Sequence, residues 1–347
     1  MAQTLLAHAG PGDLPPPFTW LRLFTQWTLD PLVAIVVLIV AAAYVSGVVM
    51  LQRRGDAWPI GRTVAFVGVG IGSVVVATQS ALATYDTVLV SVHMVQHMVL
   101  TMVAPVFLAL GAPVTLALRT LPDAPRRALL RVLHSRLAKV LSFPVVTGAI
   151  FVVNPWVLYF TPLYEASLRN PLIHELQHGH FLLIGCLFFW PLLGIDPVPG
   201  RVDYPIRLVA IFLTLPFHAF LGITIMGQGT LLARDWYAEL DRGWPPGPWH
   251  DQEWAGGILW ASGDLIGLLI FIVLFFQWLR SSRREAERED RRLDRLDELR
   301  AAAGKRVGTI GHTPLAQSGA SISNTPVSSV PVSRPHGPAP HQQSEGR

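Results

Sequence analysis

Seven long apolar segments constrain the fold of this 347-residue chain more than any other feature. Each is close to the roughly 20 residues that a helix needs to cross a bilayer. Of all residues, 51% are hydrophobic and 14% are charged, a balance outside that of soluble domains. Because backbone polar groups must be satisfied inside a bilayer, we predict an all-α integral membrane bundle of seven transmembrane helices. The segments are residues 31–51, 63–82, 88–110, 143–163, 172–193, 206–226 and 256–279.

Basic residues are unevenly divided between the connecting loops. The loops after the first, third and fifth segments, and the chain after residue 280, are rich in arginine. The alternate loops hold only Arg22, Arg169, Arg234 and Arg242. By the positive-inside rule, we expect the N-terminus outside and the C-terminus in the cytoplasm.

Composition divides the chain into four parts. We predict a short extracytoplasmic arm over residues 1–30 and the seven-helix membrane domain over 31–280. Residues 281–303 alternate in charge and predict a charged cytoplasmic helix. Residues 304–347 are rich in Ser, Pro and Gly and predict a disordered tail.

The arginine-rich loop over residues 121–141 has its apolar residues at helical spacing. It predicts an amphipathic helix on the inner membrane surface. The net charge of +4 therefore points to the lipid bilayer as a partner and not to nucleic acid, for which no motif is present.

Histidines are concentrated in two short runs, His93-Met94-Val95-Gln96-His97-Met98 and His174-Glu175-Leu176-Gln177-His178-Gly179-His180. Each run contains an i, i+4 pair, which places two imidazoles on one helix face. Both runs begin near the outer ends of their segments, so we predict that they form opposing walls of one outward-facing metal site. His180 points to nearly the opposite face and is a weaker ligand candidate.

Three polar residues on different segments share one predicted depth. A rise of 1.5 Å per residue places His97, His218 and Asp264 roughly 12–13 Å below the outer ends of their helices. An ionisable group at this depth is costly unless it faces a partner or water. We expect His218 and Asp264 to form a deeper relay or a supporting shell.

The residue types suit copper. Imidazole combined with the thioethers of Met94 and Met98 favours Cu(I), although these methionines also fit ordinary packing. Cys186 is the only cysteine, which excludes a site built from several cysteines. Gln96 and Gln177 are placed to orient the imidazoles. The predicted metal ligands are His93, His97, His174, His178, His218, Asp264, Met94 and Met98.

Two other functions fit parts of the pattern. The run from His174 to His178 matches H-E-x-x-H, in which two histidines bind zinc and Glu175 would activate water, as in a metalloprotease. Histidines on two helices also allow a bis-histidine haem protein. Short motifs in histidine-rich segments often arise by chance, so both rank below a metal carrier.

Several motifs in order along the chain resemble the CtaG-type cytochrome c oxidase assembly factors, first linked to caa-type oxidases. They cover about residues 85–265, and each is weak alone. The matching residues are His93-Met94-x-Gln96-His97-Met98, Ala104-Pro105, Leu110-Gly111-Ala112-Pro113, His174-x-x-x-His178, Phe181-Leu182-Leu183, Phe189-Trp190-Pro191, Asp251-Gln252-x-x-Ala255-Gly256 and Trp260.

The resemblance implies a non-enzymatic, multi-pass protein of the bacterial plasma membrane that helps to mature haem-copper oxidase. Its implied cargo is copper, with zinc as the alternative metal. Its implied partners are oxidase subunits and other copper chaperones. His93, His97, His174 and His178 correspond to the family's histidines, and Asp251 with Gln252 marks the last outer loop.

Overall fold

The computed structural model describes residues 14–197 and 202–310 as helices and connecting turns, with one isolated β-bridge between Trp27 and Ser80. The all-α prediction is confirmed for these residues. The chain divides into two compact units, Met1–Glu285 and Ala286–Arg347. Both histidine runs lie in the first unit.

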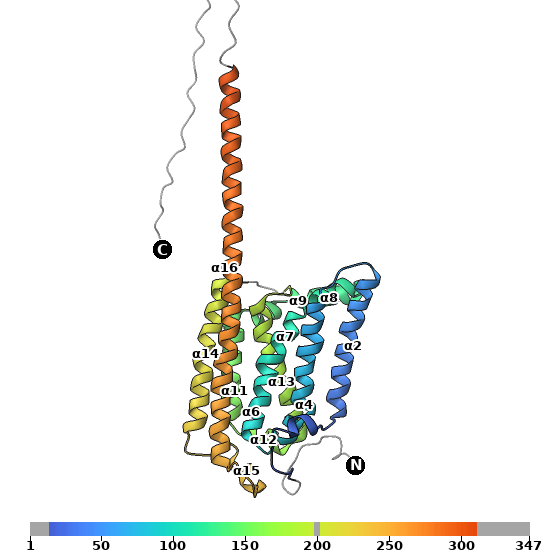
Figure 1. Ribbon diagram of the computed structural model, residues 1–347, viewed down its shortest axis with the longest axis vertical. Coiled ribbons are helices and arrows are strands. Elements are labelled where there is room, and N and C mark those ends of the chain that lie inside the picture. The colour runs from blue at the N-terminus through green and yellow to red at the C-terminus, as the bar shows by residue number, and fades with distance from the viewer. Residues whose placement is uncertain (1–13, 198–201, 311–347) are drawn as a thin grey trace, which may run out of the picture. The chain divides into compact units, whose positions relative to one another are not determined.

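The helices of the first unit run mostly along one direction, as a bundle (Figure 1). They are α1 (Arg22–Thr25), α2 (Pro31–Arg53), α3 (Ile60–Thr63), η1 (Val64–Ile71), α4 (Gly72–Gln79), α5 (Ala81–Tyr85), α6 (Val90–Met98), η2 (Val99–Val103), α7 (Ala104–Leu110), α8 (Pro113–Thr120), α9 (Asp123–Leu133), α10 (Arg136–Leu141), α11 (Pro144–Tyr159), α12 (Leu163–Arg169), α13 (Pro171–Leu193), α14 (Tyr204–Gly227), α15 (Arg234–Leu240) and the first part of α16 (Pro248–Ile310).

Six helical runs among the described residues are long and apolar enough to cross a membrane. The predicted fourth span is instead a pair of helices, α11 and α12, bent by 66°. Pro162 lies in the break, directly before α12, and a proline disfavours helical geometry in the residue before it. If the bent pair counts as one span, the number reaches seven.

The third predicted span changes its winding halfway. α6 passes into the π-helical segment η2 and then into α7, which has Pro105 in its first turn. Proline lacks the N–H of a regular helical turn, so a local change of winding accommodates it. Gly185 of α13 faces the Thr101 carbonyl and the Pro105 ring so closely that a Cβ there would collide. α13 therefore packs tightly against this run.

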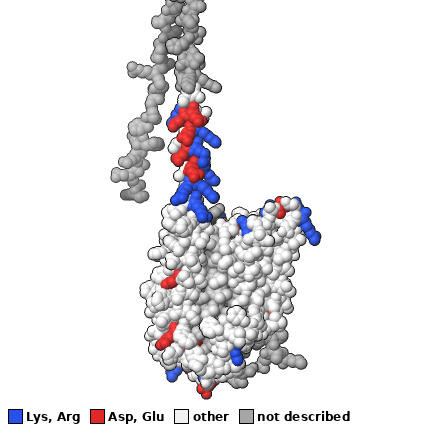
Figure 2. Space-filling view, viewed as in Figure 1, with Lys and Arg blue, Asp and Glu red and all other residues white. Residues whose placement is uncertain are grey.

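Basic side chains gather at the end of the bundle that carries α8 and α9, while the flank in view is almost uncharged (Figure 2). The predicted amphipathic helix over residues 121–141 is two helices, α9 and α10, which break at His134 and Ser135. Neither has a buried residue.

α16 continues to Ile310, past the predicted start of the tail at residue 304. Residues 311–347 of that tail, and residues 1–13 of the predicted arm, lie outside the described residues.

Candidate metal centre

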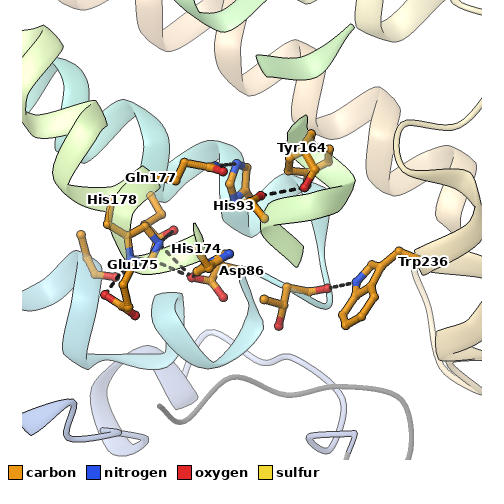
Figure 3. A network of polar contacts seen from close by, with 12 residues as sticks. Asp86, His93, Tyr164, His174, Glu175, Gln177, His178 and Trp236 are labelled. Atoms are coloured by element: carbon orange, nitrogen blue, oxygen red, sulfur yellow. Dashed lines mark hydrogen bonds and ion pairs between the residues drawn. The ribbon is translucent and has the colours of Figure 1, made fainter. Parts of the chain in front are cut away.

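The Asp86 carboxylate lies beside the imidazoles of His174 and His178 (Figure 3). Its Oδ2 is 3.0 Å from Nε2 of His174 and 3.3 Å from Nε2 of His178. One ligand atom from each residue falls within 4.8 Å of the others, and all three residues are buried. We call Asp86, His174 and His178 the Asp86 cluster.

Local helix signals position the two histidines. The Asn170 side chain accepts hydrogen bonds from the backbone N–H groups of Leu172 and Ile173, and Pro171 occupies the first turn. Both features favour a helix that starts here. The i, i+4 spacing then places His174 and His178 on one face of α13, with their ring centroids 4.6 Å apart.

Gln96 of α6 joins the cluster to the bundle. Its amide nitrogen donates to Asp86 Oδ2 and to the Ala77 carbonyl, both at 2.9 Å. Its Oε1 lies 3.0 Å from Nε2 of His178. Gln96 therefore orients both the carboxylate and one imidazole, the role we predicted for it.

Glu175 contacts the far side of the His178 ring. Its Oε2 lies 3.5 Å from Nδ1 of His178, whereas Nε2 of the same ring faces Asp86. A carboxylate behind a ligating histidine typically fixes the ring orientation and its tautomer. Glu175 thus occupies a supporting position for His178.

His93 lies next to the cluster. Its ring centroid is 6.3 Å from that of His174, and its Nε2 is 3.4 Å from the Gln177 amide nitrogen. Its Nδ1 is buried without a hydrogen-bond partner among the described residues. A buried polar nitrogen of this kind is rare in folded proteins, which makes His93 a candidate for an additional ligand beside the cluster.

His97 sits in an aromatic environment. Its ring stacks on Phe181 with centroids 4.1 Å apart, and its Nδ1 lies 2.6 Å from the Tyr159 hydroxyl. Both histidines of the first pair thus lie near the rings of Tyr159 and Phe181, and His93 lies in addition beside His174 of the Asp86 cluster.

The two methionines of the first run are buried within the main hydrophobic core. The Tyr159 hydroxyl donates to the Met94 sulfur at 3.7 Å. Met94 therefore lies on the His97 side, and Met98 belongs to the packing of the core.

His218 and Asp264 lie on α14 and α16. The His218 ring is 5.2 Å from that of Phe151. α16 packs closely against His218, since a Cβ atom at Gly263 would lie only 3.1 Å from the His218 side chain. Asp264 follows Gly263, and one of its carboxylate oxygens is buried without a hydrogen-bond partner among the described residues. These polar groups lie apart from the Asp86 cluster and are not among its ligand atoms.

Asp86 is the residue that sequence reasoning missed. It lies in the turn before α6, outside the helices that carry the two histidine runs. The available signal was a single acidic residue, in Tyr85-Asp86-Thr87, directly before a predicted span. Its partners on α13 are 88 and 92 positions away, as their residue numbers show.

Asp251 supports the same region from α16. Its carboxylate accepts hydrogen bonds from the backbone N–H groups of Val90 and Ser91, at 2.7 and 3.2 Å. It therefore caps the N-terminus of α6, a few residues before His93. Arg242 lies 3.7 Å from this carboxylate. Burial lowers the pKa of the Arg242 guanidinium, and the charge of Asp251 opposes that shift.

The fold and the cluster define a helical protein of the membrane-spanning class with a buried histidine and carboxylate site. The family described as cytochrome c oxidase caa3 assembly factor matches residues 42–281. The chain belongs to this family, as its motifs predicted.

Similar curated proteins occur in mycobacteria, each named an uncharacterized protein. Those of Mycobacterium bovis and Mycobacterium tuberculosis are 39% identical over 289 residues, and that of Mycobacterium leprae is 38% identical. The alignments cover 81% of this chain and 44% of each relative, so the chain spans less than half the length of these proteins. No solved structure is significantly similar to the chain.

Proposed function

We propose that this protein assists assembly of a caa3-type cytochrome c oxidase by binding copper at the Asp86 cluster and delivering it to the oxidase. The observation that carries the proposal is the buried juxtaposition of Asp86, His174 and His178 in a member of an oxidase assembly family. Oxidase subunits are the proposed recipients, and other copper chaperones are the proposed donors.

The donor atoms of the cluster fit a single ion. Ligand atoms about 2.0–2.2 Å from a common ion lie at most about 4.4 Å apart. The cluster atoms already lie within 4.8 Å of one another, so small side-chain shifts suffice. His93 is near enough to His174 to serve as a further ligand after a rotation of its ring.

The donor types bear on the oxidation state. Imidazole with carboxylate suits Cu(II) or zinc, whereas thioether ligands favour Cu(I). Our Cu(I) expectation used Met94 and Met98, which pack on the His97 side. We therefore propose that the cluster holds the incoming ion, and that His97 and Met94 offer a softer position to which a cuprous ion would move without a change of oxidation state.

Orientation is part of the proposal. The basic end of the bundle with α8 and α9 would face the cytoplasm, and the end with α12 and α15 would face outward. The Asp86 cluster lies near the start of α13 and directly before α6. It would thus be loaded from the extracytoplasmic side of a bacterial plasma membrane.

The contact of Glu175 argues against the metalloprotease alternative. A catalytic glutamate must face the water on the metal, but Glu175 lies at Nδ1 of His178, on the other side of the ring from the cluster. Neither the metalloprotease nor the haem protein gains a specific observation in its favour.

The function is tested in cells that lack this protein. Under copper limitation we expect the absorption spectrum of the assembled oxidase to be lost, and to return with the wild-type gene or with added copper. A gene with His174→Ala/His178→Ala should not restore the oxidase spectrum. A gene with His134→Ala should restore it, because His134 is exposed and lies at the basic end of the bundle. A normal oxidase spectrum in the deleted strain at low copper would overturn the proposal.

A further inference from the structure

Two polar side chains, those of His180 and Asn154, contact each other on the lateral surface of the bundle. Nε2 of His180, on α13, lies 2.6 Å from Oδ1 of Asn154, on α11, and this contact is exposed. The surface around it is apolar and exposed, with Leu176, Leu183 and Val157 as neighbours along the two helices. Polar side chains at membrane depth on an apolar surface are costly unless they meet a partner.

A cavity of about 300 Å³ opens beside this pair. His180 and Asn154 line it together with Gln177, whose side chain is buried. The Gln177 amide nitrogen contacts Nε2 of His93, and its Oε1 has no hydrogen-bond partner among the described residues. Polar groups therefore extend from the lateral surface inward to His93, which lies beside the Asp86 cluster.

A second cavity, of about 310 Å³, also reaches the region of the cluster, through Glu175 and His178. The rest of its lining is almost entirely apolar, from α2, η1, α4, η2, α7 and α13, with Thr78 as the other polar side chain. An ion that moved along such a surface would lose its ligands without replacement. The cavity beside His180 offers imidazole and amide groups in succession and is the better path.

We propose that His180, Asn154 and Gln177 form a lateral transfer port through which the metal passes from His93 to a transmembrane helix of the oxidase docked against α11 and α13. This inference rests on the proposed function. A free ion has no reason to leave through a lipid-facing surface, whereas a partner helix with a ligating side chain can enter the cavity there. The steps are ligand exchanges: the ion leaves Asp86, His174 and His178 as His93 and then His180 bind it, the acceptor side chain replaces these imidazoles in turn, and the ion keeps its oxidation state.

Three variants test the port. His180→Ala and Asn154→Leu should leave the metal content of the purified protein unchanged and slow the transfer of copper to the oxidase by about tenfold, the usual effect of losing a supporting polar group. His180→Gln keeps a hydrogen-bonding side chain and should retain part of the rate. Leu38→Ala, an exposed leucine on α2 and outside the proposed docking surface, is the control and should transfer at the wild-type rate. Transfer is measured as copper in oxidase isolated from copper-depleted membranes after addition of the copper-loaded protein.

Photo-crosslinking tests the docking separately from the metal. A photoreactive residue in place of Val157, at the cavity, should crosslink to an oxidase subunit, and one in place of Phe212, exposed on α14, should not. Wild-type transfer rates in His180→Ala and Asn154→Leu, with metal bound normally, would overturn the port alone. A wild-type protein that binds no copper would overturn both the port and the proposed function.

Discussion

The Asp86 carboxylate lies 3.0 Å from the His174 imidazole across 88 positions of sequence, and this contact joins the turn before α6 to the start of α13. The two histidine runs are thus linked through an acidic residue that belongs to neither. Gln96 strengthens the link, because it contacts both Asp86 and His178.

Replacing Asp86 tests the cluster. Asp86→Asn keeps the size of the side chain and removes its charge, so we expect metal affinity to fall about 10–100-fold or more. Competition with a chelator of known affinity measures this. Asp264→Asn is the comparison, because Asp264 lies outside the cluster. If Asp264→Asn lost the metal and Asp86→Asn kept it, the deeper position would be the true site.

Replacing Glu175 distinguishes a carrier from a protease. Glu175→Gln can still accept a hydrogen bond from Nδ1 of His178, so metal content and oxidase assembly should change little. A metalloprotease would lose its activity with this change, because its glutamate activates water. An assembly defect in Glu175→Gln with a full complement of metal would support the protease.

Replacing Asp251 tests the cap on α6. Asp251→Ala removes the acceptor for Val90 and Ser91 and leaves Arg242 without its carboxylate. Lost caps and broken buried pairs together predict a loss of about 2–4 kcal/mol in the free energy of unfolding. Thermal denaturation in detergent measures it, with Glu253→Ala, exposed on the same helix, as the control. Equal melting temperatures for both variants would show that the cap is not needed.

The ion pair between Arg169 and Glu239 predicts a pH dependence. Arg169 of α12 donates two hydrogen bonds to Glu239 of α15 and lowers the pKa of that carboxyl. A lowered carboxyl pKa contributes stability that is complete above the usual glutamate pKa and is lost as pH falls through the folded value. At pH 7 the wild type should therefore melt at a slightly higher temperature than Glu239→Gln. In acid the two melting temperatures should be equal. High salt should reduce it as well, because the pair is exposed. A difference that grew in acid would contradict this assignment.

Hydropathy and helix signals predicted most of the fold. The apolar segments became helices at nearly the expected positions, and Asn170 with Pro171 marks the start of α13 in the sequence itself. The bend after Tyr159 and the π-helical turn before Pro105 were missed. Proline accompanies both features, but whether a proline bends a helix, ends it or shifts its winding depends on what packs there, such as Gly185 against Thr101.

The candidate site was predictable only where it follows helical spacing. The i, i+4 rule correctly placed His174 and His178 together, because both lie on one regular helix. It could not foresee that His97 turns toward Phe181 and Tyr159, since that depends on which helix lies alongside. Asp86 lies in a turn, where no periodic rule applies, and its partners are set by tertiary packing alone.

The most direct test of the central claim is the copper content per chain of the purified protein after growth with copper. We expect about one copper per wild-type chain, as a single cluster holds one ion. We expect this copper to be lost in His174→Ala/His178→Ala and retained in His134→Ala. Equal copper in wild type and in the double histidine variant would contradict the assignment of the metal to the Asp86 cluster.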